Sequence, residues 1–142
     1  MSARRPTVRS LVVPAGAFSP ASEDLAFTNQ GYALYLDLGY GSLMAPLIFE
    51  QPEVTIKRIT LYSEDGSWMA AVCVSLMRTN PRERNEVMMG QVCSSQGWEV
   101  VSTTAISPGR ITGDFGAYLK LTLGGTYADS LRFFAVRIVY SY

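Results

Sequence analysis

The chain has 142 residues, of which 48% are hydrophobic and 17% are charged, and it contains no histidine. This length suits one domain with a core of its own. Twelve basic and twelve acidic residues cancel, so no net charge steers the protein toward nucleic acid or a membrane. Without histidine the chain lacks the usual general base and the commonest metal ligand, so we expect no enzymatic activity and no cofactor.

The N-terminal segment combines arginines with a short apolar stretch, as a signal peptide does. Pro14 interrupts this stretch after Leu11–Val13, far short of the apolar region that a signal peptide needs. The same shortage argues against Arg4 and Arg5 as a twin-arginine signal. No apolar run approaches a membrane span. We therefore expect synthesis in the cytoplasm without Sec export, with the final location left open, including a virion or an extracellular assembly.

The chain divides into two parts by composition. Residues 1–9 are predicted to be a flexible basic arm that carries Arg4, Arg5 and Arg9. The arm is either a disordered chain end or a segment that becomes ordered on a neighbouring subunit. Residues 10–142 are predicted to be one domain.

Short segments with alternating apolar residues follow each other through this domain. Tyr32–Leu38 alternates cleanly, and Pro46 places the strand after it at an edge or a bulge. In 54–62 the alternation slips at Lys57-Arg58, which predicts a β-bulge or a corner. The polar loop 79–85 is predicted to join two strands of a hairpin. Further strands are expected at 11–13, 43–49, 68–77, 86–93, 97–106, 117–123 and 131–142.

The C-terminal segment 131–142 is the clearest strand, because β-branched and aromatic residues alternate without Gly or Pro. Its alternation places Val136 and Ile138 on the inner face. No segment shows the period of an amphipathic helix, and no repeat is present. The sequence therefore predicts an all-β protein, an antiparallel β-sandwich of jelly-roll type with about nine or ten strands.

The two cysteines cannot form a disulfide framework. In one register of the predicted hairpin, Cys73 stands opposite Cys93 with both side chains pointing outward. In that register the geometry allows a cross-strand disulfide. The preferred interpretation is two reduced thiols that pack as small apolar groups.

Exposed aromatic residues are the best candidates for a ligand site. Tyr40, Trp68 and Trp98 lie in or near predicted turns and would form a platform for stacking sugars. Acidic residues in turns do not have the spacing of a calcium loop, so no metal site is assigned. Nothing places two carboxylates together as a catalytic pair, so no catalytic residue is assigned.

Several short motifs carry a resemblance. They are Val13–Phe18, Ala45–Leu47, Ile59–Tyr62 and Ala135–Tyr140. Together they resemble a group of single-domain β proteins of bacterial and phage-like origin, and this resemblance implies a β-sandwich module. In size and style the chain is also similar to jelly-roll decoration, or cement, proteins that trimerise on virus shells.

The leading functional hypothesis from the sequence is a structural module that associates with itself, for example as a trimer. Such a module would build or decorate a shell or capsid surface. It depends on the low charge, the absence of histidine and apolar residues expected to point outward. The predicted interface comprises Arg4, Arg5, Arg9, Met77, Val101, Phe133, Ala135 and Val139. The alternative is a lectin-like β-sandwich that binds carbohydrate through Tyr40, Trp68 or Trp98.

Overall fold

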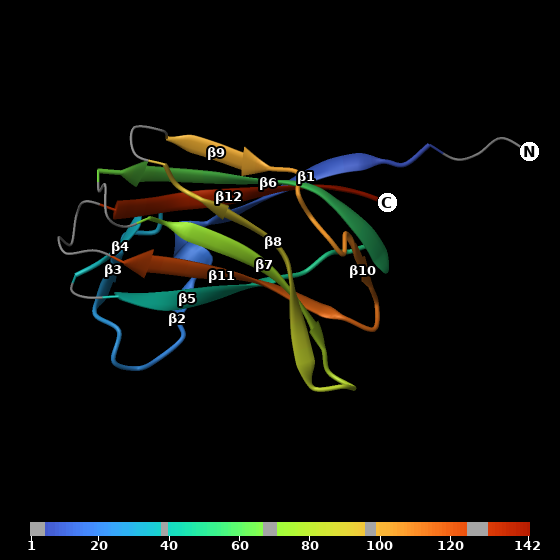
Figure 1. Cartoon of the computed structure of the whole chain (residues 1–142), viewed down its shortest axis with the longest axis horizontal. Helices are drawn as coiled ribbons and strands as arrows, with labels where there is room; N and C mark the ends of the chain where they lie inside the picture. Colours follow the sequence, from blue (N-terminus) through green and yellow to red (C-terminus); the bar gives the residue numbers. More distant parts are fainter. Residues whose placement is uncertain (1–4, 38–39, 67–70, 96–98, 125–130) are drawn as a thin grey trace, which may run out of the picture.

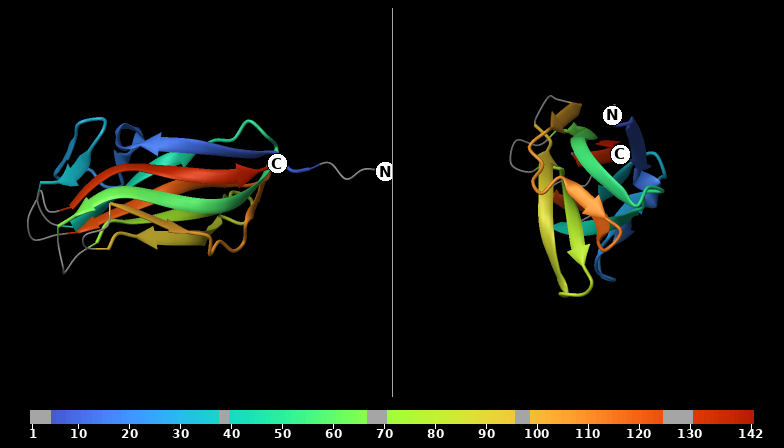
Figure 2. Two further views of the ribbon diagram at one scale, coloured as in Figure 1. Left: turned by 90° about the horizontal axis from the view of Figure 1, so that it is seen from above. Right: turned by 90° about the vertical axis from the view of Figure 1, so that its right-hand side faces the viewer.

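The computed structural model describes residues 5–37, 40–66, 71–95, 99–124 and 131–142. Two antiparallel sheets stack face to face, with the hydrophobic core between them (Figure 1; Figure 2, right). The predicted antiparallel β-sandwich is therefore confirmed. Among the described residues, no helix has the length and apolar character needed to cross a membrane.

Sheet A is built around its two longest strands. It consists of β1 (Val8–Pro14), β3 (Phe27–Asn29), β4 (Leu34–Leu36), β6 (Glu53–Asp65), β9 (Val100–Thr103), β10 (Arg110–Thr112) and β12 (Leu131–Ser141). β6 and β12 pair along most of their lengths, β9 and β10 pair with β6, and β1 and β4 pair with β12. The C-terminal strand is thus a central strand with partners on both sides.

Sheet B forms the second layer. In spatial order it consists of β2 (Ser19–Pro20), β5 (Tyr40–Leu47), β11 (Gly116–Gly124), β7 (Cys73–Asn80) and β8 (Asn85–Cys93). A single 3-10 turn, η1 (Ala15–Ala17), follows β1. Twelve strands are described, more than the nine or ten expected, because β2, β3 and β10 are only two or three residues long. Alternation cannot be detected over so few residues.

The last three residues of the predicted N-terminal arm, residues 7–9, belong to the domain. The Thr7 N–H donates to the Tyr142 carbonyl at 2.8 Å, and the Tyr142 N–H donates to the Thr7 carbonyl at 3.0 Å. Arg9 lies within β1, and its Nε donates to the Tyr142 hydroxyl at 3.1 Å. Arg5 is exposed before β1, and Arg4 lies outside the described residues. From Thr7 onward, the chain's own C-terminal strand holds this segment.

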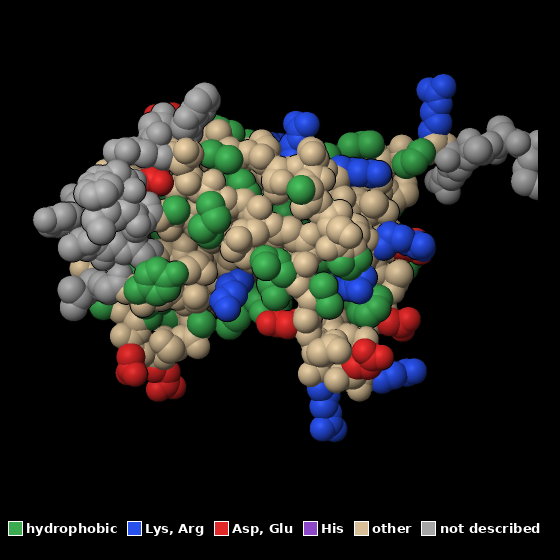
Figure 3. Space-filling view, viewed as in Figure 1, with side chains coloured by type: hydrophobic (Ala, Val, Ile, Leu, Met, Phe, Trp, Pro, Cys, Tyr) green, Lys and Arg blue, Asp and Glu red, His purple; other side chains and the backbone are tan. Residues whose placement is uncertain are grey.

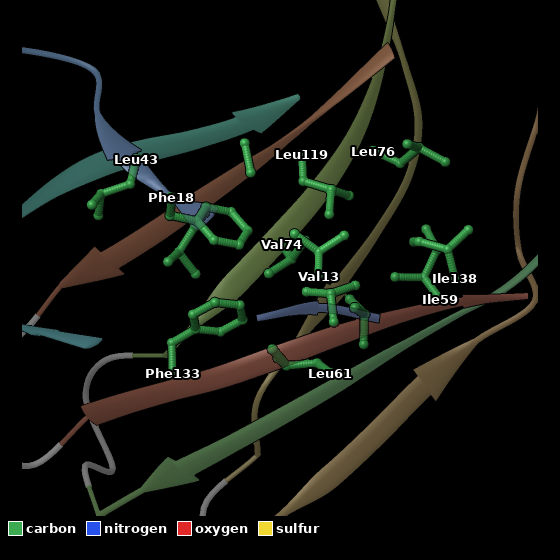
Figure 4. Packing of buried hydrophobic residues seen from close by; sticks show 14 of the residues in the cluster. Val13, Phe18, Leu43, Ile59, Leu61, Val74, Leu76, Leu119, Phe133 and Ile138 are labelled. Carbon is green, nitrogen blue, oxygen red and sulfur yellow. The ribbon is translucent and has the colours of Figure 1, made fainter. Parts of the chain in front are cut away.

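The pairing of β12 with β6 contains a register shift that changes which side chains face the core. The shift lies between Phe133 and Ala135, and both Phe133 and Val136 are completely buried. Phe133 packs edge-on against Phe18 with ring centroids 4.9 Å apart (Figure 4). The predicted outward orientation of Phe133 is therefore wrong, because an extra residue in one strand interrupts strict alternation.

A second register shift confirms the bulge expected at Lys57-Arg58. In the pairing with β12, Arg58 stands opposite Val139 and Ile56 stands opposite Tyr140, which leaves Lys57 as the extra residue. Both sides of the bulge keep their apolar residues inside the sandwich.

The other apolar residues predicted to face outward behave differently from one another. Val101 stands opposite the buried Leu61 and packs against the core, so its predicted outward orientation is wrong. Ala135 and Val139 face outward but are half-buried, since β1 and β6 flank β12 on both sides. Met77 is half-buried on the outer face of sheet B. The chain itself covers much of the apolar surface that the sequence analysis assigned to a partner.

Replacement of Phe133 by alanine tests the burial of this side chain. Phe133→Ala should lower the free energy of unfolding by about 3–5 kcal/mol, because it leaves a cavity beside Phe18. Val139→Ala, on the outer side of the same strand, should cost less than about 1 kcal/mol. Urea unfolding of the two variants measures both values, and equal losses would contradict the assigned orientation of Phe133.

Candidate functional site

The outer face of sheet B is the most regular surface that combines an exposed aromatic ring with polar side chains. Tyr40 begins β5 and is 74% exposed. It stands opposite Gly124 of β11 and shares its side of β5 with Ser42 and Met44. Trp68 and Trp98, the other members of the predicted platform, lie outside the described residues. Of this platform, the structure therefore places Tyr40, on a sheet face.

The strand registers arrange the remaining outward side chains of sheet B in rows across the strands. The first row contains Ser42, Thr122, Cys73 and Cys93, and the second contains Ser19, Met44, Lys120, Ser75 and Gln91. The third contains Pro46, Tyr118, Met77 and Met88. Tyr40 and Pro46 are separated by about 20 Å along β5 at the usual rise per residue. Over this length the first two rows are mainly polar, and the third consists of proline, tyrosine and methionine side chains.

Two hydrogen bonds fix polar side chains on this face. Gln91 Nε2 donates to Ser75 Oγ at 3.0 Å, and the Tyr118 hydroxyl donates to Glu86 Oε2 at 2.6 Å. Burial, the hydrogen bond to Glu86 and the negative charge of Glu86, in that order, raise the pKa of Tyr118 to about 12. The Tyr118 ring is therefore neutral and held in place at physiological pH.

The molecule is hollowed beneath sheet B. Two projections extend from the lower side of the molecule, the connection between β2 and β3 and the tip of the β7–β8 hairpin (Figure 1). The space-filling view shows a hollow between them (Figure 3). The β2–β3 connection carries the exposed acids Glu23 and Asp24, while the hairpin tip carries Arg82, Glu83 and Arg84. An extended ligand on the outer face of sheet B would lie between these two projections.

A disulfide joins Cys73 to Cys93 at one end of the face. The two residues are paired across β7 and β8 with their Cα atoms 4.1 Å apart, so the register left open by the sequence is the observed one. The preferred interpretation of two reduced thiols differs from the structure. The alternation of residues placed both sulfurs on one side of the hairpin but carried no information about their oxidation.

The polar groups of this face were not among the site residues predicted from the sequence. Tyr118, Lys120 and Ser75 lie on the outer side of sheet B, where neighbouring side chains bury Ser75. The contact between Tyr118 and Glu86 requires the pairing of β11 with β7 and of β7 with β8, which alternation within one strand does not specify. Among the described residues, no group of three or more Cys, Asp or Glu side chains could hold a metal ion.

Comparison with solved structures gives the same architecture. The C-terminal CBM6 module of LamC, a marine laminarinase from Zobellia galactanivorans, is similar over 92% of this chain and 98% of its own, with 14% identity and a TM-score of 0.56. A low-affinity xylan-binding module, CBM86, from Roseburia intestinalis is similar over 93% and 94%, with 12% identity and a TM-score of 0.54.

A third similar structure is a larger one. It contains the CBM22-1 and GH10 modules of xylanase 10B from Clostridium thermocellum in complex with xylohexaose, and it has 12% identity and a TM-score of 0.57. This chain covers 26% of that protein, and 89% of this chain is matched. No family model and no curated protein matches the sequence. At these identities the comparisons establish the β-sandwich fold.

The hypothesis of a self-associating shell or decoration module is corrected by these findings. The three similar structures described above each contain a carbohydrate-binding module. The structure also removes part of its basis, because Phe133 and Val101 face the core and Arg9 bonds to Tyr142 of the same chain. The findings favour the alternative hypothesis of carbohydrate binding.

The titration of Tyr118 provides a test of the hydrogen bond on this face. Because the folded state favours the neutral ring, its stabilising contribution is complete below pH 10 and is lost as the pH rises from about 10 to about 12. Glu86→Gln removes the negative charge and should lower the pKa of Tyr118, while burial keeps it above the ordinary value. NMR titration of ¹³C-labelled tyrosines measures this, with Tyr118→Phe as the assignment control. Titration of Tyr118 together with the exposed tyrosines would contradict the structure.

The disulfide can be tested through its effect on stability. It spans 20 residues of sequence, and its removal should lower the free energy of unfolding by about 3 kcal/mol. The variant Cys73→Ser/Cys93→Ser should show this loss in urea, and a reducing agent should destabilise the wild type but leave the variant unchanged. Equal sensitivity of the two proteins to reductant would argue against the bond.

Proposed function

We propose that the protein is a non-catalytic carbohydrate-binding module that binds a glycan chain along the outer face of sheet B. The observation that carries this proposal is the row arrangement, which places hydroxyl and amide groups beside Tyr40, Tyr118 and methionine side chains on one extended face. A sugar ring has apolar C–H faces and a polar hydroxyl rim, so it needs both kinds of group side by side.

The similar structures support the same ligand class. Two of them are described as a carbohydrate-binding module of a laminarinase and a xylan-binding module, and this chain spans nearly the whole of each. Fold similarity alone does not imply function, so the weight of the proposal lies on the face itself.

The Cys73–Cys93 disulfide is consistent with action outside the cytoplasm. Disulfides persist in oxidising compartments, and a soluble module that binds extracellular polysaccharide works in such a place. We therefore include an extracytoplasmic location in the proposal.

Affinity electrophoresis with laminarin, xylan and mannan in the gel tests the proposal directly. We expect retardation by at least one β-glycan, and Tyr40→Ala should weaken it about tenfold because a stacking ring is lost. Tyr32→Ala is a matched control, since Tyr32 is 70% exposed but lies outside sheet B, and it should leave binding unchanged. The absence of retardation by any glycan, or equal losses in the two variants, would contradict the proposal.

A further inference from the structure

The end of the sandwich at which β5 passes into β6 contains two adjoining pockets. One, of about 380 Å³, is lined by residues of β1 and β12 and by the connection 48–51. The other, of about 420 Å³, lies on the opposite side of the same connection and extends to Ile111 and Phe115. The C-terminus marks this end in Figure 1, whereas Tyr40 begins β5 at the other end. These pockets are therefore separate from Tyr40 and the rows that begin beside it.

The first pocket has an aromatic wall. Tyr140 and Tyr142 stack with ring centroids 6.3 Å apart, and Phe49 packs edge-on against Tyr140 at 4.9 Å. The Tyr142 hydroxyl accepts a hydrogen bond from Arg9 Nε, and Tyr142 is 40% exposed. The rings hold each other in place while part of Tyr142 remains available to a ligand.

A buried polar atom also lies beside this wall. Gln51 lines both pockets, and its Oε1 atom is buried without a hydrogen-bond partner among the described residues. An unpaired buried acceptor costs about 1–3 kcal/mol, so native proteins usually supply a donor for it. A ligand hydroxyl in the pocket would be such a donor once rotation of the Gln51 side chain brings this buried atom to the pocket surface.

The charges and the shape of the pocket narrow the ligand class. The charged side chains that line the first pocket are Arg9 and Glu50, which carry opposite signs, so a ligand without net charge fits this rim. Its volume lies at the small end of the range for small-molecule sites. It is a compact pocket at the end of the sandwich, in contrast to the long face of sheet B. A small, neutral, hydroxyl-rich ring combines these properties.

We propose that the pocket formed by Phe49, Gln51, Tyr140 and Tyr142 is a second saccharide site that takes the terminal sugar of a glycan. The ring stacks on Tyr142, and one of its hydroxyls donates to Gln51 Oε1. The ligand class rests on the proposed function, while the location is independent of sheet B.

NMR titration of the full chain with methyl β-xyloside, methyl β-glucoside, xylohexaose and laminarihexaose tests this inference. We expect the monosaccharide glycosides to shift the signals of Gln51 and Tyr142 alone, and a hexasaccharide to shift these and the signals of Tyr40 and Lys120. Tyr142→Ala should weaken binding of the monosaccharide glycosides in the pocket about tenfold. It should leave the hexasaccharide-induced shift of the Tyr40 signals unchanged. Tyr40→Ala should weaken hexasaccharide binding on sheet B and leave the shifts of the Gln51 and Tyr142 signals unchanged.

Gln51→Met separates a ligand contact from a merely structural role. It removes the unpaired acceptor at similar size, so we expect an unchanged or higher melting temperature together with about tenfold weaker binding in the pocket. A higher melting temperature with unaltered binding would overturn the inference. If the saccharides shift the signals of Tyr40 but not those of Gln51, the pocket is not a saccharide site, and the proposed function is unaffected. The reverse response supports the pocket and refutes the site on sheet B, and no response to any probe refutes both.

Discussion

The pairing of β12 with β6 on one side and with β1 on the other is the interaction on which sheet A depends. It joins the C-terminal strand to segments from the first half of the chain, and it carries Phe133, Val136 and Ile138 into the core. The same pairing continues to Thr7 and Tyr142 at the end of the sandwich. The position of Arg9 and of the terminal tyrosines therefore follows from the backbone ladder rather than from a loop.

Sheet B depends on a different set of constraints. Its outer face is held by backbone pairing of β5, β11, β7 and β8, and it is reinforced by the disulfide and by the Tyr118–Glu86 hydrogen bond. Side chains on paired strands are positioned more accurately than side chains on loops. Binding on this face would cost the protein less conformational entropy than binding that must first order a loop, because paired strands already hold the side chains in place.

The sequence predicted the parts of the fold where polarity reports orientation. The bulge at Lys57 was predictable because two adjacent charged residues interrupt an apolar alternation. The bulge after Phe133 was not, because Phe133 and Phe134 are both apolar and either could face the core. The predicted hairpin allowed the register that pairs Cys73 with Cys93 without selecting it, and the oxidation of the two thiols depends on the environment. Pairing between distant strands, which assembles the rows of the proposed site on sheet B, leaves no trace within a single strand.

The low charge of the chain has a different explanation if the protein binds carbohydrate, as proposed. A surface with few charged groups was first taken as surface for burial in an assembly. The rows on the outer face of sheet B instead carry neutral hydroxyl, amide and thioether groups, with Lys120 as their one charged residue. Arg9 and Glu50, of opposite charge, both line the pocket beside Tyr142. A neutral glycan gains little from charged partners, since their desolvation costs more than a hydroxyl group returns. Neutral polar groups beside aromatic rings avoid this cost, so the composition that suggested self-association is one that favours uncharged, hydroxyl-rich ligands.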